Sequence, residues 1–158
     1  MPLTYPSYVN TIPIRYWRKP SFNVVAGPQW EYGYGLSYSR FVYNNFSTDA
    51  QVYRISDPNF VVNVYVDVTN NGPMDGKYTI LVFVDDEYRS IEKEVKLLKA
   101  FSKVDLRGGQ STRVRFALSK RDFSFTGLDG QLLIEPGNFT LSVDVGAASD
   151  TTQITLVP

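Results

Sequence analysis

Residues 62–69 alternate strictly between apolar and polar side chains, and this alternation constrains the fold more than any other feature of the sequence. A period of two places every second side chain on the same face of an extended strand. The apolar face carries Val62, Val64, Val66 and Val68. A strand of this kind lies with one face on a core and the other in water, as is typical of antiparallel sheets.

Comparable runs recur along the chain. Residues 112–118 and 139–145 alternate in the same way. Residues 40–46 are predicted to form the opening strand, with Phe41 and Tyr43 on one face, and residues 99–106 to form a further strand. Residues 78–84 are apolar on both faces, which predicts a central strand. The chain is therefore rich in short strands.

Turn residues separate these runs. Residues 70–76 contain the Asn, Gly and Pro that suit a hairpin turn, and Gly108-Gly109 marks another turn. Residues 147–150 are interpreted as the turn before a last strand, which contains Ile154 and Leu156. Each turn allows the next strand to run back along the previous one.

Two longer connections complete the pattern. The polar residues 47–59 are predicted to join two strands without a strand of their own, and residues 119–137 are long enough to cross from one sheet to another. About seven strands at this spacing favour an all-β fold, namely a fibronectin type III-like or immunoglobulin-like β-sandwich, over a barrel.

Residues 1–29 have no useful period and are predicted to form an extended N-terminal arm or linker, with the sandwich over residues 30–158. Five prolines exclude a long helix in this arm. Its apolar residues are too numerous for a free tail, so we expect it to pack on its own sandwich or on something outside this chain. These residues are Tyr5, Tyr8, Ile12, Ile14, Tyr16, Trp17 and Phe22.

Composition excludes several classes of chemistry. The chain contains no Cys and no His, so it has no disulfide, no thiolate nucleophile and no imidazole base or ligand. The 16 basic and 16 acidic residues are not segregated into blocks, which gives no reason to expect a nucleic-acid or membrane partner. No apolar run reaches membrane-spanning length, and the first twenty residues do not resemble a signal peptide.

Two glycine motifs fail as catalytic or cofactor signatures. Residues 33–38 begin like a dinucleotide fingerprint, but Tyr38 replaces the third glycine and a strand follows where a helix is needed. Residues 35–39 resemble a nucleophile elbow but lack its second glycine and a histidine base. We therefore expect no cofactor and no catalytic residue from these motifs.

Carboxylates offer the remaining route to catalysis or metal binding. A pair of acids can hydrolyse a glycoside without histidine, so a small two-carboxylate hydrolase is the least favoured of three hypotheses. The acids lie mainly in turns and on outward faces, and neither Asp85-Asp86-Glu87 nor the region of Asp75 has calcium-loop spacing. Solvated turn acids are the preferred interpretation, without a metal.

Aromatic residues are the strongest candidates for a functional surface. The five proposed docking residues are Trp17, Trp30, Tyr32, Tyr34 and Tyr38. Flat rings can stack on sugars, but clustered large rings are more often anchors of a packed interface. Asn45-Phe46-Ser47 and Asn138-Phe139-Thr140 fit the N-glycosylation pattern, which would place Asn45 and Asn138 on an extracellular protein.

Five segments, in order, resemble one protein family. Residues 31–43 resemble the F-G-Y-G-L-S-Y-T-x-F-x-Y segment that opens the C-terminal fibronectin type III-like domain of family 3 glycoside hydrolases, which include β-glucosidases and β-xylosidases. Residues 66–76, 98–106, 114–122 and 135–143 resemble the following segments of that domain.

This resemblance implies a noncatalytic accessory domain of a secreted glycoside hydrolase. Residues 1–10 look like the exit from the preceding domain, and the docking aromatics would rest against the catalytic domains of the same polypeptide. The family's catalytic residues lie outside the sandwich and have no counterpart here. The signal peptide would then lie upstream of this chain. The alternative is a stand-alone module that binds polysaccharide or assembles with copies of itself through the arm.

Overall fold

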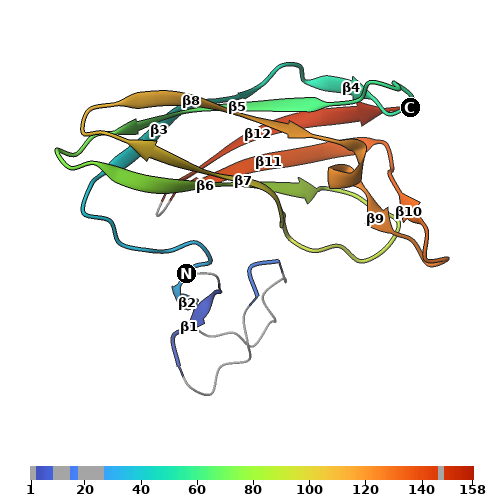
Figure 1. The fold of residues 1–158 in the computed structure, drawn as a ribbon. Helices are drawn as coiled ribbons and strands as arrows, with labels where there is room; N and C mark the ends of the chain where they lie inside the picture. Colours follow the sequence, from blue (N-terminus) through green and yellow to red (C-terminus); the bar gives the residue numbers. More distant parts are fainter. Residues whose placement is uncertain (1–2, 9–14, 18–26, 146–147) are drawn as a thin grey trace.

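The computed structural model describes residues 3–8, 15–17, 27–145 and 148–158 of the 158-residue chain. Two sheets whose strands are mainly antiparallel lie face to face (Figure 1). The smaller sheet has the order β3 (Phe41–Thr48), β5 (Val62–Asn70), β8 (Ser111–Leu118). The larger sheet has the order β4 (Val52–Arg54), β12 (Ala148–Val157), β11 (Gly137–Val145), β6 (Gly76–Asp86), β7 (Leu97–Leu106), with β4 paired in parallel. The predicted all-β sandwich is confirmed.

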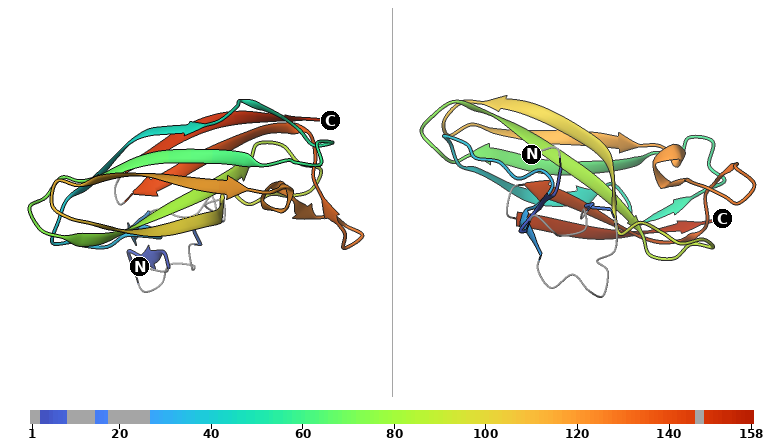
Figure 2. Two further views of the ribbon diagram at one scale, coloured as in Figure 1. Left: turned by 45° about the horizontal axis from the view of Figure 1, so that its top comes forward. Right: turned by 90° about the horizontal axis from the view of Figure 1, so that it is seen from below.

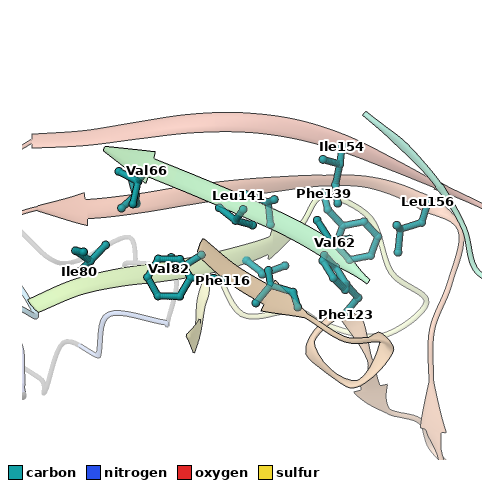
Figure 3. Close-up of a cluster of buried hydrophobic side chains, with 14 of the residues drawn as sticks. Val62, Val66, Ile80, Val82, Phe116, Phe123, Phe139, Leu141, Ile154 and Leu156 are labelled. Atoms are coloured by element: carbon teal, nitrogen blue, oxygen red, sulfur yellow. The ribbon is translucent and has the colours of Figure 1, made fainter. Parts of the chain in front are cut away.

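The core lies between the two sheets (Figure 3). The four valines of β5 are fully buried, as their alternation predicts. The facing sheet contributes mainly Ile80, Val82, Phe139, Leu141, Val143, Ile154 and Leu156. Strand β6 lies between β11 and β7 and is therefore central, as its two apolar faces indicate.

The long connection after β8 crosses from the smaller to the larger sheet, as predicted. It contains the short 3-10 helix η1 (Lys120–Phe123) and a hairpin of β9 (Phe125–Thr126) and β10 (Leu132–Leu133). Phe123 of η1 is buried against Phe139, at a ring separation of 5.4 Å. Among the described residues, no helix is long and apolar enough to span a membrane.

Several predicted boundaries are wrong in detail. Residues 47–59 contain β4, which pairs with the end of β12. Strand β7 begins at Leu97, two residues before the predicted start. Strand β12 begins at Ala148, so residues 148–150 continue the strand instead of forming a turn, and residue 147 lies outside the described part.

One buried polar residue fixes the point where the aromatic loop enters the sandwich. Asn70 is fully buried, and its amide nitrogen donates to the carbonyls of Met74 (2.7 Å) and Leu106 (3.0 Å). Its amide oxygen accepts from the Ser39 hydroxyl (2.5 Å) and the Gly72 amide (3.1 Å). The end of β5, the following turn and the loop before β3 are thereby held together.

Described parts of the arm lie beside the larger sheet, on the side away from the smaller one (Figures 1 and 2). Strands β1 (Tyr5–Pro6) and β2 (Pro28–Trp30) form a small antiparallel ribbon. Residues 9–14 and 18–26 of the predicted arm, including Ile12, Ile14 and Phe22, lie outside the described residues. The division at residues 29 and 30 stays a prediction.

Candidate docking surface

The arm packs on the outer face of β6. Phe83 is only 1% exposed although it lies outside the hydrophobic cluster between the two sheets, and the Tyr16 and Tyr32 rings cover it at centroid distances of 5.6 and 6.3 Å. These two tyrosines contact each other at 4.5 Å, and the Lys96 ammonium lies 4.5 Å from the Phe83 centroid. Of the proposed docking residues, Tyr32 is thus turned onto its own sandwich.

Backbone contacts hold the same part of the arm to the start of β7. The amide of Leu98 donates to the Tyr16 hydroxyl at 3.3 Å, and the amide of Val95 donates to the carbonyl of Trp17 at 2.8 Å. The Trp17 ring is half-buried, with the Arg15 guanidinium 5.3 Å from its centroid. Of the proposed docking residues, Trp17 is thus held beside the start of β7.

A second aromatic group is turned away from the core. The Trp30 ring contacts Tyr5 at 5.1 Å and stacks on Tyr34 at 6.2 Å with an interplanar angle of 22°. Tyr5 and Trp30 remain 47% and 37% exposed. Further along the same loop, the side chains of Leu36 and Tyr38 are 92% and 101% exposed. We call Tyr5, Trp30, Tyr34, Leu36 and Tyr38 the aromatic patch.

The structure adds residues that the predicted docking set lacks. Tyr5 and Tyr16 belong to the apolar residues of the arm, but nothing in the sequence separates them from the other members. The outer-face residues Leu81 and Phe83 are signalled by the two apolar faces of residues 78–84. The sequence therefore indicates the aromatic loop, but it does not indicate which of the rings pack on the larger sheet and which remain exposed.

Gly33 is the point at which the aromatic loop lies close to Leu81 on β6. Its φ is +88°, a conformation that side chains with a Cβ rarely adopt, and an added Cβ would lie 2.9 Å from Leu81 Cδ1. Beside this contact, a cavity of about 220 Å³ lies between the loop and β6. Its lining includes Tyr32, Leu36 and Leu81 together with the more polar Ser37, Lys77 and Thr79.

Acidic side chains elsewhere have structural partners. The Asp85 carboxylate pairs with the Lys93 ammonium at 2.6 Å, and Glu87 accepts from the side chains of Thr140 (3.0 Å) and Gln153 (2.9 Å). The Asp75 carboxylate accepts from the amide of Gly108 at 3.1 Å. Among the described residues, no group of three or more Asp and Glu side chains is arranged to hold a metal ion.

One small cavity combines charged groups with displaced pKa values. Burial raises the pKa of Asp86 and lowers that of Lys99. Burial alone would raise the pKa of Glu94, but its hydrogen bond with Arg89 helps to hold it below its usual range. A raised and a lowered carboxyl beside one cavity form the pattern of an acid–base pair. However, the cavity measures about 20 Å³, which holds one water and no sugar ring.

Both glycosylation candidates have exposed side chains. Asn45 lies at the bulge of β3 with φ of 55°, and its amide nitrogen donates to Asp67 at 2.8 Å. The Asn138 amide oxygen accepts from the Thr155 hydroxyl at 3.0 Å. Modification of either residue stays a prediction.

Comparison with known proteins defines the class. Residues 78–148 match the sequence model of the fibronectin type III-like domain family, in agreement with the two-sheet sandwich. A lysosomal β-glucosidase from Dictyostelium discoideum is 35% identical over 90% of this chain, and a β-xylosidase from Formosa agariphila is 29% identical over 94%. This chain covers 18% and 21% of those proteins.

Solved structures agree with the sequence relatives. A β-glucosidase from Erythrobacter marinus aligns with 98% of this chain at a TM-score of 0.88 and 28% identity, over 21% of its own chain. The GH3 β-glucosidase from Bifidobacterium adolescentis aligns with 79% of this chain at a TM-score of 0.69 and 26% identity, over 18% of its own chain. This chain therefore belongs to the fibronectin type III-like domains found within family 3 β-glucosidases and β-xylosidases. It spans about a fifth of the length of the curated relatives it matches.

Proposed function

We propose that this chain is a noncatalytic accessory domain of a family 3 glycoside hydrolase, which packs against the catalytic domains and stabilises them. The observation that carries this proposal is the exposed aromatic patch on a sandwich whose core is already complete. The relatives support it, because about four fifths of their length lies outside the region that this chain matches. The parent protein would be a β-glucosidase or β-xylosidase.

The energy available from the patch is sufficient for docking. If a partner buried roughly 60 Å² more apolar surface on each of Trp30, Tyr34 and Tyr38, the apolar contribution would be about 4–5 kcal/mol at roughly 25 cal/mol per Å². A covalent link to the partner would reduce the entropic cost of association. The main remaining cost of docking is the conformational entropy that the loop loses when it becomes ordered.

Solution mass tests whether the patch meets another copy of the chain. Light scattering over a range of concentrations is expected to show a monomer, unchanged by Trp30→Ala or Tyr34→Ala. An oligomer that either substitution dissolves would replace the accessory role with self-assembly. Binding of the chain to β-glucan or xylan in affinity electrophoresis, lost in Tyr38→Ala, would favour a polysaccharide-binding module.

The longer polypeptide tests the stabilising role directly. Trp30→Ala combined with Tyr38→Ala is expected to lower the Tm of the catalytic part while kcat below that temperature stays unchanged. Thr151→Ala, which changes an exposed residue of β12, is the matched control. An unchanged Tm in the double variant would contradict docking through the patch. The isolated chain is expected to hydrolyse neither β-glucosides nor β-xylosides.

Secretion and glycosylation are separate parts of the proposal. Both sequon asparagines are exposed, so a glycan at Asn45 or Asn138 meets no core side chain. Expression through a eukaryotic secretory pathway is expected to add mass that peptide N-glycosidase removes. Asn45→Gln and Asn138→Gln would assign the sites, and an intact mass equal to that of the bare chain would contradict the proposal.

A further inference from the structure

The cavity between the aromatic loop and β6 is large enough for one ring-sized group. Its volume is about 220 Å³, whereas a protein cavity of about 150 Å³ binds benzene. It lies beside the outer face of the larger sheet and is distinct from the sandwich core. The cavity opens to solvent, so a side chain that enters it displaces water from its walls.

The loop is held so that it cannot simply collapse onto the strand. Tyr32 at one wall is packed against Tyr16 and Phe83, and Gly33 lies so close to Leu81 that an added Cβ would be 2.9 Å from Leu81 Cδ1. The turn over residues 31–34, which contains Tyr32 and Gly33, is closed by a hydrogen bond from the Tyr34 amide to the Glu31 carbonyl, at 3.1 Å. The space between Leu36 and Thr79 is therefore a consequence of how the loop is anchored.

The walls favour a side chain with an apolar body and a polar tip. Tyr32, Leu36 and Leu81 supply apolar surface, while the hydroxyls of Ser37 and Thr79 can donate or accept hydrogen bonds. The Lys77 ammonium is also in the lining, and it pairs weakly with Asp105 at 3.6 Å. Tyrosine and tryptophan combine a large ring with one polar group, and they are frequent anchors in interface pockets.

We propose that this cavity receives a tyrosine or tryptophan side chain from the catalytic part of the same polypeptide. The inference rests on the proposed accessory function, because it names the anchor point of that docking. The position of Leu36 supports it, because this 92% exposed residue lines the cavity and lies two residues before the fully exposed Tyr38 of the patch. The length of the relatives beyond this region supplies a partner on the same chain.

A small probe tests the cavity in the isolated chain. Phenol and indole represent the two side chains, and each is titrated while the backbone amide signals are followed by NMR. Saturable shifts are expected at Gly33, Gly35 and Thr79. Thr79→Trp should fill the cavity from its floor and abolish these shifts. Thr151→Trp makes the same change on the same face of the sheet, two strands away, and should leave them intact.

A second filling variant protects the test against misfolding. An added Cβ at Gly35 meets no atom within 4 Å, so Gly35→Leu is expected to enter the cavity without backbone strain. If Thr79→Trp does not fold, Gly35→Leu takes its place. The absence of saturable shifts up to the solubility limit of both probes would overturn the inference, as would shifts that persist in the folded filled variant.

The longer polypeptide separates this inference from the proposed function. Thr79→Trp is expected to lower the Tm of the catalytic part as the patch substitutions do, while Thr151→Trp leaves it unchanged. If the patch substitutions lower that Tm but Thr79→Trp does not, the cavity inference fails and the accessory function stands. If neither lowers it, both fail.

Discussion

The sandwich core and the aromatic patch use the same kinds of side chain in opposite ways. Both use aromatic rings, but Phe139 in the core is 1% exposed whereas Tyr38 in the patch is 101% exposed. Core side chains find their partners within the two sheets, whereas Leu36 and Tyr38 of the patch leave almost all of their surface in water. Stability of the isolated chain should therefore depend on the core and be almost independent of the patch.

The largest effect is expected from a cavity in the core. Phe139→Ala removes a ring that is buried on central strand β11 and packs edge-to-face with Phe123. Substitutions of this kind cost about 3–5 kcal/mol, because the lost burial adds to the energy of the cavity. Denaturant unfolding measures the loss. A change below about 1 kcal/mol would mean that the two regions differ less than their burial indicates.

Asn70→Ala is expected to be nearly as damaging although it removes few atoms. It would leave the carbonyls of Met74 and Leu106 and the amide of Gly72 without their side-chain partner. Unsatisfied buried groups cost about 1–3 kcal/mol each, so a total loss of about 3 kcal/mol is expected. Asn71→Ala, at the exposed neighbouring position, is the matched control and should change the free energy of unfolding little.

These two regions also differ in how far sequence can predict them. Strict alternation predicted β5, β8 and β11, because a half-buried strand has to repeat every two residues. Strand β4 was missed because three residues are too few to show a period, and its pairing with β12 is formed between distant segments. The order of the chain alone does not specify such pairing.

The candidate site is likewise only partly predictable, because its contacts join segments that are distant in the sequence. The sequence identified Trp30, Tyr34 and Tyr38 as an aromatic cluster, and the structure places the first two in ring contact. The sequence does not predict that Tyr32 packs on Phe83, because nothing in it distinguishes these two rings from the other apolar residues nearby. The buried Asn70 gave no pattern at all, since its role depends on carbonyls from two separate segments.

One methyl group added at Gly33, where the aromatic loop lies on β6, is expected to lower the free energy of unfolding. Gly33→Ala combines an unfavourable φ of +88° with a 2.9 Å approach to Leu81, so a loss of about 1–2 kcal/mol is expected. Gly35→Ala has neither problem and should be neutral or slightly stabilising, because alanine restricts the unfolded chain. Thermal unfolding of both variants measures the contrast. Equal Tm values would show that the loop does not rest on β6 in solution.

Acid should weaken the sandwich slightly through Asp49. Burial would raise its pKa, but hydrogen bonds from Tyr53 (2.6 Å) and Asn63 (2.6 and 3.0 Å) hold it below 3.8. Because the folded pKa is the lower one, the stabilisation is complete above pH 3.8 and is lost as the pH falls through the folded pKa. Asp49→Asn should therefore make unfolding less dependent on pH in this range. If the free energy of unfolding of that variant fell at low pH as steeply as that of the unmodified chain, Asp49 would not be the group responsible.

The smallest effect is expected at the most exposed ring. Tyr38→Ala should change the free energy of unfolding of the isolated chain by less than about 0.5 kcal/mol, because the side chain is fully in water. Tyr32→Ala is the contrasting variant in the same loop, and it should destabilise measurably by uncovering Phe83. A large loss in Tyr38→Ala would show that the patch is packed within the chain, and the surface would then not be available to the catalytic domains. A negligible loss leaves the ring exposed in the isolated chain, as docking requires.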